Sequence, residues 1–141
     1  MTLIVDAAPL IAGGDASDPL HGPVRRVLTD ESGPLVLPAP VTTEVDFMLR
    51  KLGGAMAVRR FLSDIANGLF VVEGLSQEEH GMALFLHDRY KDLDLGLADL
   101  SVMVLARRYG TRRILTFDER HFRAVQPLQG GWFILLPADA P

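Results

Sequence analysis

Short apolar runs alternate along the chain with longer stretches in which apolar residues recur every three or four positions. Runs rich in aliphatic and β-branched residues predict strands at 3–5, 35–37, 69–72, 113–117 and 132–136. Helical spacing predicts helices at about 7–12, 19–29, 41–52, 55–66, 76–90 and 97–109, with a short helical turn at 119–124. Strands that alternate with helices in this way predict an α/β protein with a mostly parallel sheet, covered by helices on both faces.

Two of the predicted helices carry local end signals. Ser76 followed by Glu79 forms a capping box, in which the two residues satisfy free amide groups at the start of the helix. Gly110 follows the most apolar helix of the chain and is typical of a residue that stops a helix. Both signals favour the helices at 76–90 and 97–109.

Length and composition narrow the class of protein. With 141 residues, 48% of them apolar and 23% charged, the chain is expected to form one globular domain over residues 1–141. No apolar run approaches the roughly 20 residues that span a bilayer, and no signal peptide is predicted. The absence of cysteine suits a reducing cytoplasm. The net charge of −4 argues against a protein that coats nucleic acid by bulk electrostatics.

Two of the predicted strands are followed at once by aspartate. Asp6 follows the strand at 3–5, and Asp118 follows the strand at 113–117. Ligand sites of open α/β sheets lie just beyond the carboxyl ends of the strands, so the two carboxylates are expected to meet there. Aspartate is also a favoured N-cap, and each residue has the alternative role of capping the helix that follows it. A cap and a metal ligand are compatible uses of one side chain.

Two further acids lie on predicted helices. Glu44 falls nearer the apolar face of helix 41–52 than Asp46 does, so Glu44 is the better candidate for a cleft and Asp46 for a solvated charge. The alternative for Glu44 is an ordinary surface charge. Asp99 stands in the first turn of a helix that is apolar all round, where an unpaired charge is costly and a bound cation would offset the cost. Asp94 is interpreted as a cap or an exposed charge outside the site.

The candidate site therefore consists of four acids: Asp6, Glu44, Asp99 and Asp118. Ligands that are all oxygen suit Mg²⁺ or Mn²⁺ rather than zinc, and divalent ions held by carboxylates are typical of phosphoryl chemistry. Six arginines lie between positions 107 and 123. The candidates for contact with flanking phosphates are Arg112, Arg113, Arg120 and His121. A phosphate-binding GxxxxGK[ST] loop is absent, which argues against that class of nucleotide hydrolase.

Four short pieces of the sequence, taken in order, carry a family resemblance. They are Leu3–Asp6, Thr43–Val45, Leu95–Asp99 and Ile114–Phe122. The last piece contains Thr-Phe-Asp-Glu-Arg-His-Phe, which is close to a T-x-D-x-x-H-F ending. Each piece is short, but their order and spacing over nearly the full length are specific. In these features the chain resembles PIN-domain ribonucleases, and more narrowly the VapC toxins of bacterial toxin–antitoxin pairs.

The resemblance implies a three-layer α/β/α sandwich and Mg²⁺-dependent cleavage of RNA. By match of position it implies that the four acids form the family's acidic site and that Thr116 supplies its neighbouring hydroxyl. Ala7 and Ala8 depart from the serine or threonine that many members carry after the first aspartate, which removes one supporting hydrogen bond.

Partners are also implied by the resemblance. It implies a homodimer and a cognate antitoxin, whose C-terminal segment wraps the toxin and masks the site. DNA would be bound only indirectly, through the antitoxin. The helices at 41–66 carry apolar residues that are interpreted mostly as core, with a partner helix as the alternative: Phe47, Met48, Met56, Phe61 and Leu62.

The preferred hypothesis is a cytoplasmic, metal-dependent endoribonuclease that cleaves loops of transfer or ribosomal RNA. Water would attack the phosphodiester in line and leave a 5′-phosphate and a 3′-hydroxyl. The alternative from another class is a non-catalytic PIN-like module that holds RNA or an antitoxin. Clustered acids argue against it, because negative charge near phosphates weakens binding. A metal-dependent phosphatase for small molecules is a third option.

Overall fold

The fold is built around one sheet of five parallel strands. The computed structural model describes residues 1–141, and its strands lie in the order β3-β2-β1-β4-β5. All four strand pairings are parallel. The strands are β1 (Leu3–Val5), β2 (Leu35–Pro38), β3 (Val71–Glu73), β4 (Arg113–Leu115) and β5 (Ile134–Leu136).

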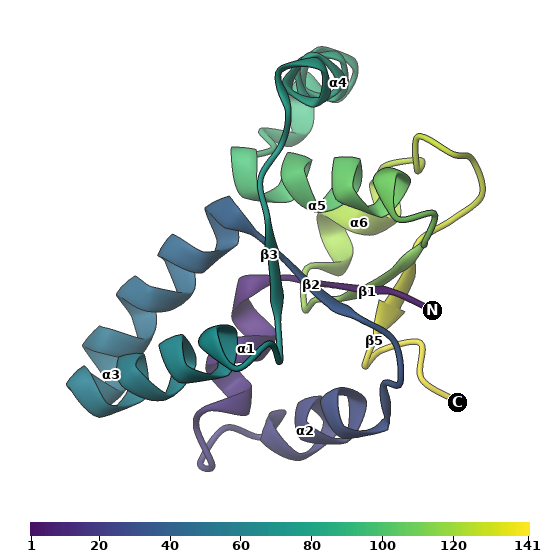
Figure 1. The fold of residues 1–141 in the computed structure, drawn as a ribbon. Coiled ribbons are helices and arrows are strands. Elements are labelled where there is room, and N and C mark those ends of the chain that lie inside the picture. Colours follow the sequence, from purple (N-terminus) through teal and green to yellow (C-terminus); the bar gives the residue numbers. More distant parts are fainter.

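Six α-helices complete the fold and cover both faces of the sheet. They are α1 (Ala7–Gly13), α2 (His21–Asp30), α3 (Ala39–Ala66), α4 (Gln77–Arg89), α5 (Leu97–Arg108) and α6 (Glu119–Ala124), with a 3₁₀ turn at Lys91–Leu93. In Figure 1, α1 and α2 lie below the strands, while α5 and α6 lie above them. The predicted α/β/α sandwich with a parallel sheet is therefore confirmed. None of these helices is long and apolar enough to cross a membrane.

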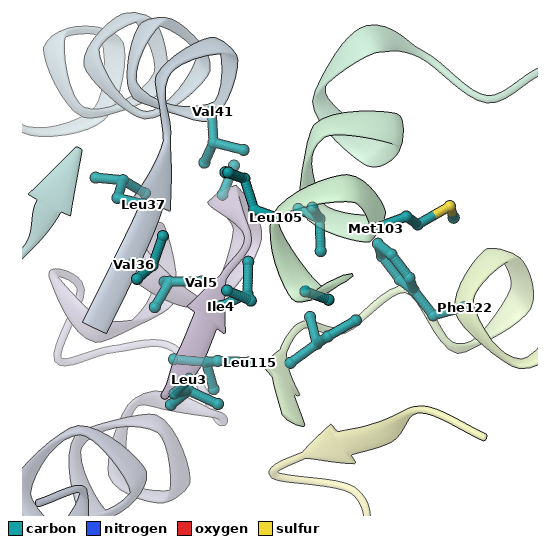
Figure 2. Close-up of a cluster of buried hydrophobic side chains, with 14 of the residues drawn as sticks. Leu3, Ile4, Val5, Val36, Leu37, Val41, Met103, Leu105, Leu115 and Phe122 are labelled. Atoms are coloured by element: carbon teal, nitrogen blue, oxygen red, sulfur yellow. The ribbon is translucent and has the colours of Figure 1, made fainter. Parts of the chain in front are cut away.

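The core is centred on the middle strand, β1. Ile4 pairs with Val36 on one side and with Ile114 on the other, and all three residues of β1 are fully buried. Figure 2 shows the side chains of β1 between those of β2 and those of α5. A strand that is buried on both faces needs a continuous apolar run, and Leu3-Ile4-Val5 supplies it. Each such side chain contributes roughly 1.5–3 kcal/mol on burial.

Strand ends differ from the predicted ranges where the sheet meets solvent. The strand predicted at 69–72 is β3 (Val71–Glu73), an edge strand, and both Val71 and the preceding Leu69 are exposed. The strand predicted at 113–117 ends at Leu115, so Thr116 lies just beyond the sheet. The last strand begins at Ile134 rather than at 132. An apolar run marks a strand well but does not show where its ladder of hydrogen bonds ends.

The two helical segments predicted at 41–52 and 55–66 are both present. They follow one another without a loop, and together they form α3 (Ala39–Ala66). Its kink lies at Gly54, whose φ of 67° and ψ of −161° are not helical. Glycine adopts a positive φ without the steric cost of a Cβ atom, so Gly53-Gly54 serves as a bend rather than as a loop.

Three of the five apolar residues that were interpreted mostly as core are exposed, which corrects the interpretation made from the sequence. Phe61 is buried and Met48 is half-buried, as expected. Phe47, Met56 and Leu62 are exposed, with 57–73% of their surface accessible. The helix packs on α1, β2, β3 and α5, and its opposite side faces solvent. Periodicity alone does not show which side of a long helix is covered.

The predicted helix ends are confirmed. The Glu79 backbone N–H donates to Ser76 Oγ at 3.1 Å, and the Ser76 N–H donates to Glu79 Oε1 at 2.9 Å. Gly110 has a φ of 62° directly after the cap of α5. Asp94 is exposed and does not cap α5, because Gly96 occupies the N-cap position.

Candidate active site at the carboxyl edge of the sheet

Asp6 occupies the centre of the site because β1 is the middle strand. Its backbone N–H donates to the Leu115 carbonyl at 2.9 Å, which fixes the point where the chain leaves the sheet. Oδ1 accepts from the Ala7 N–H at 2.9 Å, and Oδ2 accepts from the Thr116 hydroxyl at 2.7 Å. Burial raises the pKa of Asp6, and the charge of Asp118 raises it further. Asp6 therefore caps α1 and also faces a second acid, as the sequence allowed.

Thr116 links the two aspartates that follow strands. Its hydroxyl donates to Asp6, and the same oxygen accepts from the Asp118 N–H at 3.0 Å. Thr116 is itself buried, and its backbone N–H bonds to the Leu136 carbonyl of the neighbouring strand. A β-branched residue held at both backbone and side chain has little freedom to move. The positions of Asp6 and Asp118 are thus coupled through one rigid group.

Asp118 caps the short helix α6 and contacts His121 twice. Its Oδ1 accepts from the His121 backbone N–H at 3.0 Å, and its Oδ2 lies 2.7 Å from His121 Nδ1. The three-residue spacing places both groups in the first turn of α6. The sequence analysis placed His121 only as an RNA contact, although this spacing is the signal that pairs it with Asp118.

Asp99 and Glu44 enter the site from helices. Asp99 lies in the first turn of α5, where its Oδ2 accepts from the Gly96 N–H at 3.3 Å. Burial raises the pKa of Asp99, and the charge of Asp6 adds to this, whereas His121 opposes it. Partial loss of solvent around its carboxylate raises the pKa of Glu44, and the charges of Asp6 and Asp99 raise it further. The four acids therefore converge closely enough to repel one another.

Glu44 and Asp46 differ in a way that the sequence did not predict. Glu44 is exposed, while Asp46, expected to be the more solvated of the two, is half-buried and bonds to Arg50 at 3.3 Å. Of the two residues, only Glu44 interacts with the other acids. It can reach them because α3 begins directly after β2, and the carboxyl end of β2 lies beside that of β1. Its direction, rather than its burial, brings Glu44 to the site.

Three side chains of the site are close enough to share one metal ion. Asp99, Asp118 and His121 each offer a ligand atom, and these atoms lie within 4.8 Å of one another. Asp6 and Glu44 act on this group through their charges. No lysine or arginine forms an ion pair with any of the four acids. The negative charge of the site is therefore offset only by His121, when that imidazole is protonated.

The candidate phosphate-binding arginines separate into two groups. Arg112 donates to the carbonyl oxygens of Gly130 and Gln129, and Arg113 forms an ion pair with Glu31 at 2.5 Å. Both stand at the amino end of β4, which is the opposite edge of the sheet from Asp118. Arg120 is exposed, forms no ion pair and lies two residues after Asp118. Of the three arginines, Arg120 is the one that lies at the same end of β4 as Asp118 and has no partner within the chain.

The four acids line neither of two cavities that lie elsewhere on the molecule. One cavity of about 260 Å³ is lined by residues from 85–90 and 126–130. A second, of about 620 Å³, lies between α1, α2 and α3 and is mostly apolar.

Comparisons with known proteins agree with this fold. A family model of the PIN domain matches residues 3–126. Ribonuclease VapC26 of Mycobacterium tuberculosis is 34% identical over 135 residues, which cover 96% of this chain and 100% of that protein.

Two solved structures share the fold. The crystal structure of VapC20 from Mycobacterium tuberculosis, a toxin that cleaves the sarcin–ricin loop, has a TM-score of 0.74 at 20% identity. It covers 82% of this chain and 89% of its own. VapBC2 from Rickettsia felis, bound to a DNA fragment from its promoter, has a TM-score of 0.67 at 12% identity, over 96% of this chain and 97% of its own. The chain therefore belongs to the PIN-domain family, and within it to the VapC type.

Proposed function

We propose that this protein is a metal-dependent endoribonuclease, the toxin of a toxin–antitoxin pair, and that residues 1–141 form its single nuclease domain. The observation that carries the proposal is the convergence of four carboxylates at the carboxyl edge of the sheet, without a paired arginine or lysine. Carboxylates that raise one another's pKa cost free energy when they are ionised close together, and a bound cation offsets this cost. The 34% identity to a VapC ribonuclease supports the same activity.

The donor set fits Mg²⁺ or Mn²⁺. Hard cations of this kind prefer carboxylate oxygens, and the residues that would hold the ion are Asp6, Glu44, Asp99 and Asp118. When bound, the ion activates water and neutralises charge on the phosphodiester. The raised pKa values of Asp6, Glu44 and Asp99 reflect a cost that cation binding would remove.

The protein's own groups would position these acids and the RNA. Thr116 holds Asp6 and the backbone of Asp118 in one arrangement, so the carboxylates need little reorganisation when substrate binds. Arg120 would hold a flanking phosphate, where its planar guanidinium suits bidentate contact. In-line attack by water would leave a 5′-phosphate and a 3′-hydroxyl on the two fragments. Attack by the RNA's own 2′-hydroxyl would leave a 2′,3′-cyclic phosphate instead.

The proposed substrate is an exposed loop of a structured RNA, in transfer RNA or ribosomal RNA. Unpaired loops present a backbone that bends into a site, whereas a regular duplex does not. VapC20, which shares the fold, cleaves such a loop in ribosomal RNA.

The proposed partner is a cognate antitoxin, and the proposed state of the toxin is a cytoplasmic homodimer. Exposed apolar side chains on α3 and α4 leave surface for protein partners: Phe47, Met56, Leu62, Leu84 and Phe85. With a net charge of −4, the toxin would meet promoter DNA only through the antitoxin. The related VapBC2 is known in complex with a promoter fragment.

The test is to incubate purified, antitoxin-free protein with total RNA in the presence of Mg²⁺, Mn²⁺ or EDTA, and then to map the fragment ends. Discrete fragments with 5′-phosphates are expected with either metal and none with EDTA. The same experiment identifies the RNA and its cleaved bases.

Asp99→Asn and Asp94→Asn are the matched pair for this test. Both remove one carboxylate from the same short segment, but only Asp99 faces the other acids. Loss of all cleavage is expected for Asp99→Asn and full cleavage for Asp94→Asn. Equal cleavage by the two variants would remove Asp99 from the site. Intact RNA with folded wild-type protein in every buffer would favour the non-catalytic binding module.

A further inference from the structure

His121 holds both oxygens of one acid in the site. Its backbone N–H donates to Asp118 Oδ1 at 3.0 Å, and its ring Nδ1 lies 2.7 Å from Asp118 Oδ2. An ionised carboxylate only accepts hydrogen bonds, so the proton of this bond belongs to Nδ1. The imidazole is half-buried, with 22% of its side chain exposed.

The two aspartates that follow strands are thus held in the same manner. One carboxylate oxygen of Asp6 accepts a hydrogen bond from a backbone N–H, and the other accepts one from the Thr116 hydroxyl. One carboxylate oxygen of Asp118 accepts a hydrogen bond from a backbone N–H, and the other is bonded to the His121 ring. Asp118 lies after the end of β4, with backbone angles of −88° and 76° that belong to neither strand nor helix. Its side chain is held by the His121 backbone N–H on one oxygen, and the ring contact holds the second oxygen and so fixes the orientation of the carboxylate.

We propose that His121 is a positioning residue for Asp118: its Nδ1–H fixes the carboxylate so that the other oxygen lone pairs face Asp99. The inference rests on the proposed function and adds to it a residue outside the acidic set. Hydrogen bonds from groups next to metal ligands commonly change metal affinity by roughly 10–100-fold when they are removed. In this role Nδ1 is a donor to Asp118 and is not itself a metal ligand.

Three substitutions separate positioning from ligation. Asn places its amide nitrogen where Nδ1 lies, Gln reaches toward the position of Nε2, and Ala removes both groups. The substitutions are His121→Asn, His121→Gln and His121→Ala, and the backbone N–H bond to Asp118 persists in all three. His80→Ala is the control, because His80 also bonds through Nδ1 near the start of its helix, to the Ser76 carbonyl at 2.8 Å and away from the acids.

The measurement is the affinity of the full metal-free chain for Mn²⁺, by titration calorimetry, with thermal unfolding to show that each variant is folded. We expect His121→Ala to bind Mn²⁺ roughly 10–100-fold more weakly than wild type. His121→Asn is expected to recover most of the affinity, His121→Gln to recover little, and His80→Ala to equal wild type. In the metal-free wild type, a long-range ¹H–¹⁵N spectrum is expected to show the proton of His121 on Nδ1.

The outcomes separate this inference from the proposed function. If wild type and His121→Ala bind Mn²⁺ equally while RNA is cleaved, positioning by His121 is wrong and the nuclease stands. Recovery by Gln but not by Asn would show ligation through Nε2 and overturn the inference, as would a neutral ring protonated on Nε2 alone. If folded wild-type protein neither binds Mn²⁺ nor cleaves RNA, both the inference and the proposed function are wrong.

Discussion

The molecule carries two clusters of charged side chains that differ in balance. In the first, Arg108 of α5 binds Glu73, Glu79 and the Gly74 carbonyl, and so ties α5 to β3 and α4. The hydrogen bonds from Arg108 lower the pKa of Glu79 to about 2. In the second, four acids at the carboxyl edge of the sheet have no such partner, and burial and mutual repulsion raise the pKa of three of them.

The difference shows how to distinguish a structural charge cluster from a functional one. The cluster of Arg108 is complete within the chain, because each carboxylate meets a guanidinium or a cap. The acidic cluster is completed only by a cation from outside. Perturbed pKa values occur in both, so the sign of the perturbation is more informative than its presence. Four experiments test this contrast, starting with the largest expected effect.

Thr116→Val should lower the rate of RNA cleavage by roughly 10–100-fold, as for other groups that orient metal ligands. Valine keeps the shape of the side chain but loses the bonds to Asp6 Oδ2 and the Asp118 N–H. Thr116→Ser keeps the hydroxyl and should retain most activity. Cleavage assays at saturating Mg²⁺ measure both variants, and equal loss in Val and Ser would assign the effect to packing instead.

Addition of Mg²⁺ should stabilise the wild-type protein. A ligand at 100 times its dissociation constant adds about 2.7 kcal/mol to the free energy of unfolding. Thermal unfolding with Mg²⁺ or EDTA, at matched ionic strength, should show an increase of several degrees with the metal. Asp99→Asn should lose most of this increase. A similar response in both proteins would mean that the metal acts elsewhere on the chain.

Arg108→Met should lower the free energy of unfolding by about 1–2 kcal/mol, because it removes a charged, partly exposed network of hydrogen bonds. Glu73 and Glu79 would lose their shared partner. Arg107→Met is the control, since Arg107 is exposed and forms no ion pair. Urea unfolding provides the measurement. RNA cleavage at low temperature should be unchanged in both variants. A loss of cleavage in Arg108→Met would show that the Arg108 cluster also supports the acidic site, which contradicts the contrast between the two clusters.

The two clusters should respond to pH in opposite directions, with the smallest effect of the four. Glu79 has a folded pKa near 2, below its unfolded value, so its contribution is present above about pH 4.3 and is lost as the pH falls toward 2. Asp6, Glu44 and Asp99 have raised pKa values, so without metal they destabilise the protein as the pH rises above about 4.

Unfolding by urea at pH 3, 5 and 7, in EDTA, measures this contrast. As the pH falls from 7 toward about 4, wild type should gain stability from the acidic site, and as it falls further toward 2 it should lose the contribution of Glu79. Asp99→Asn should weaken the first change and Arg108→Met the second. Identical pH profiles for the two variants would contradict the assignment of either cluster.

The sequence was sufficient to predict how the strands bring acids together. Asp6 directly follows the most deeply buried run, and parallel pairing aligns its strand end with that of β4. Asp99 was evident as a charge within an otherwise buried helix. These inferences succeeded because burial and periodicity are local properties that a continuous apolar run records directly.

The sequence misled where closeness along the chain was taken as closeness in space. Arg112 and Arg113 lie near Asp118 in sequence, but β4 runs between them and the acid. Three strand residues span roughly 10 Å, so the arginines reach the opposite edge of the sheet. There they bind a loop and Glu31. The two arginines precede the body of the strand, whereas the acid follows it, and this feature of the sequence could have excluded them from the site.

Other features depend on tertiary structure and could not be predicted. The exposure of Phe47 and Met56 depends on what covers α3, which periodicity does not specify. The bond between His121 and Asp118 depends on side-chain rotamers as well as on spacing. The direction of the Glu44 side chain depends on where α3 begins, which is set by the position of β2 in the sheet.

The bond between Asp6 and Thr116 joins residues that are 110 positions apart in the chain. During synthesis Asp6 leaves the ribosome early, and the strand that completes its surroundings follows much later. At roughly 5–20 residues per second, the interval is about 5–20 s. Until β4 has emerged and paired with β1, neither Thr116 nor Asp118 is in place, and the growing chain has no complete site. The order of the strands therefore delays the assembly of the acidic site until β4 has been made.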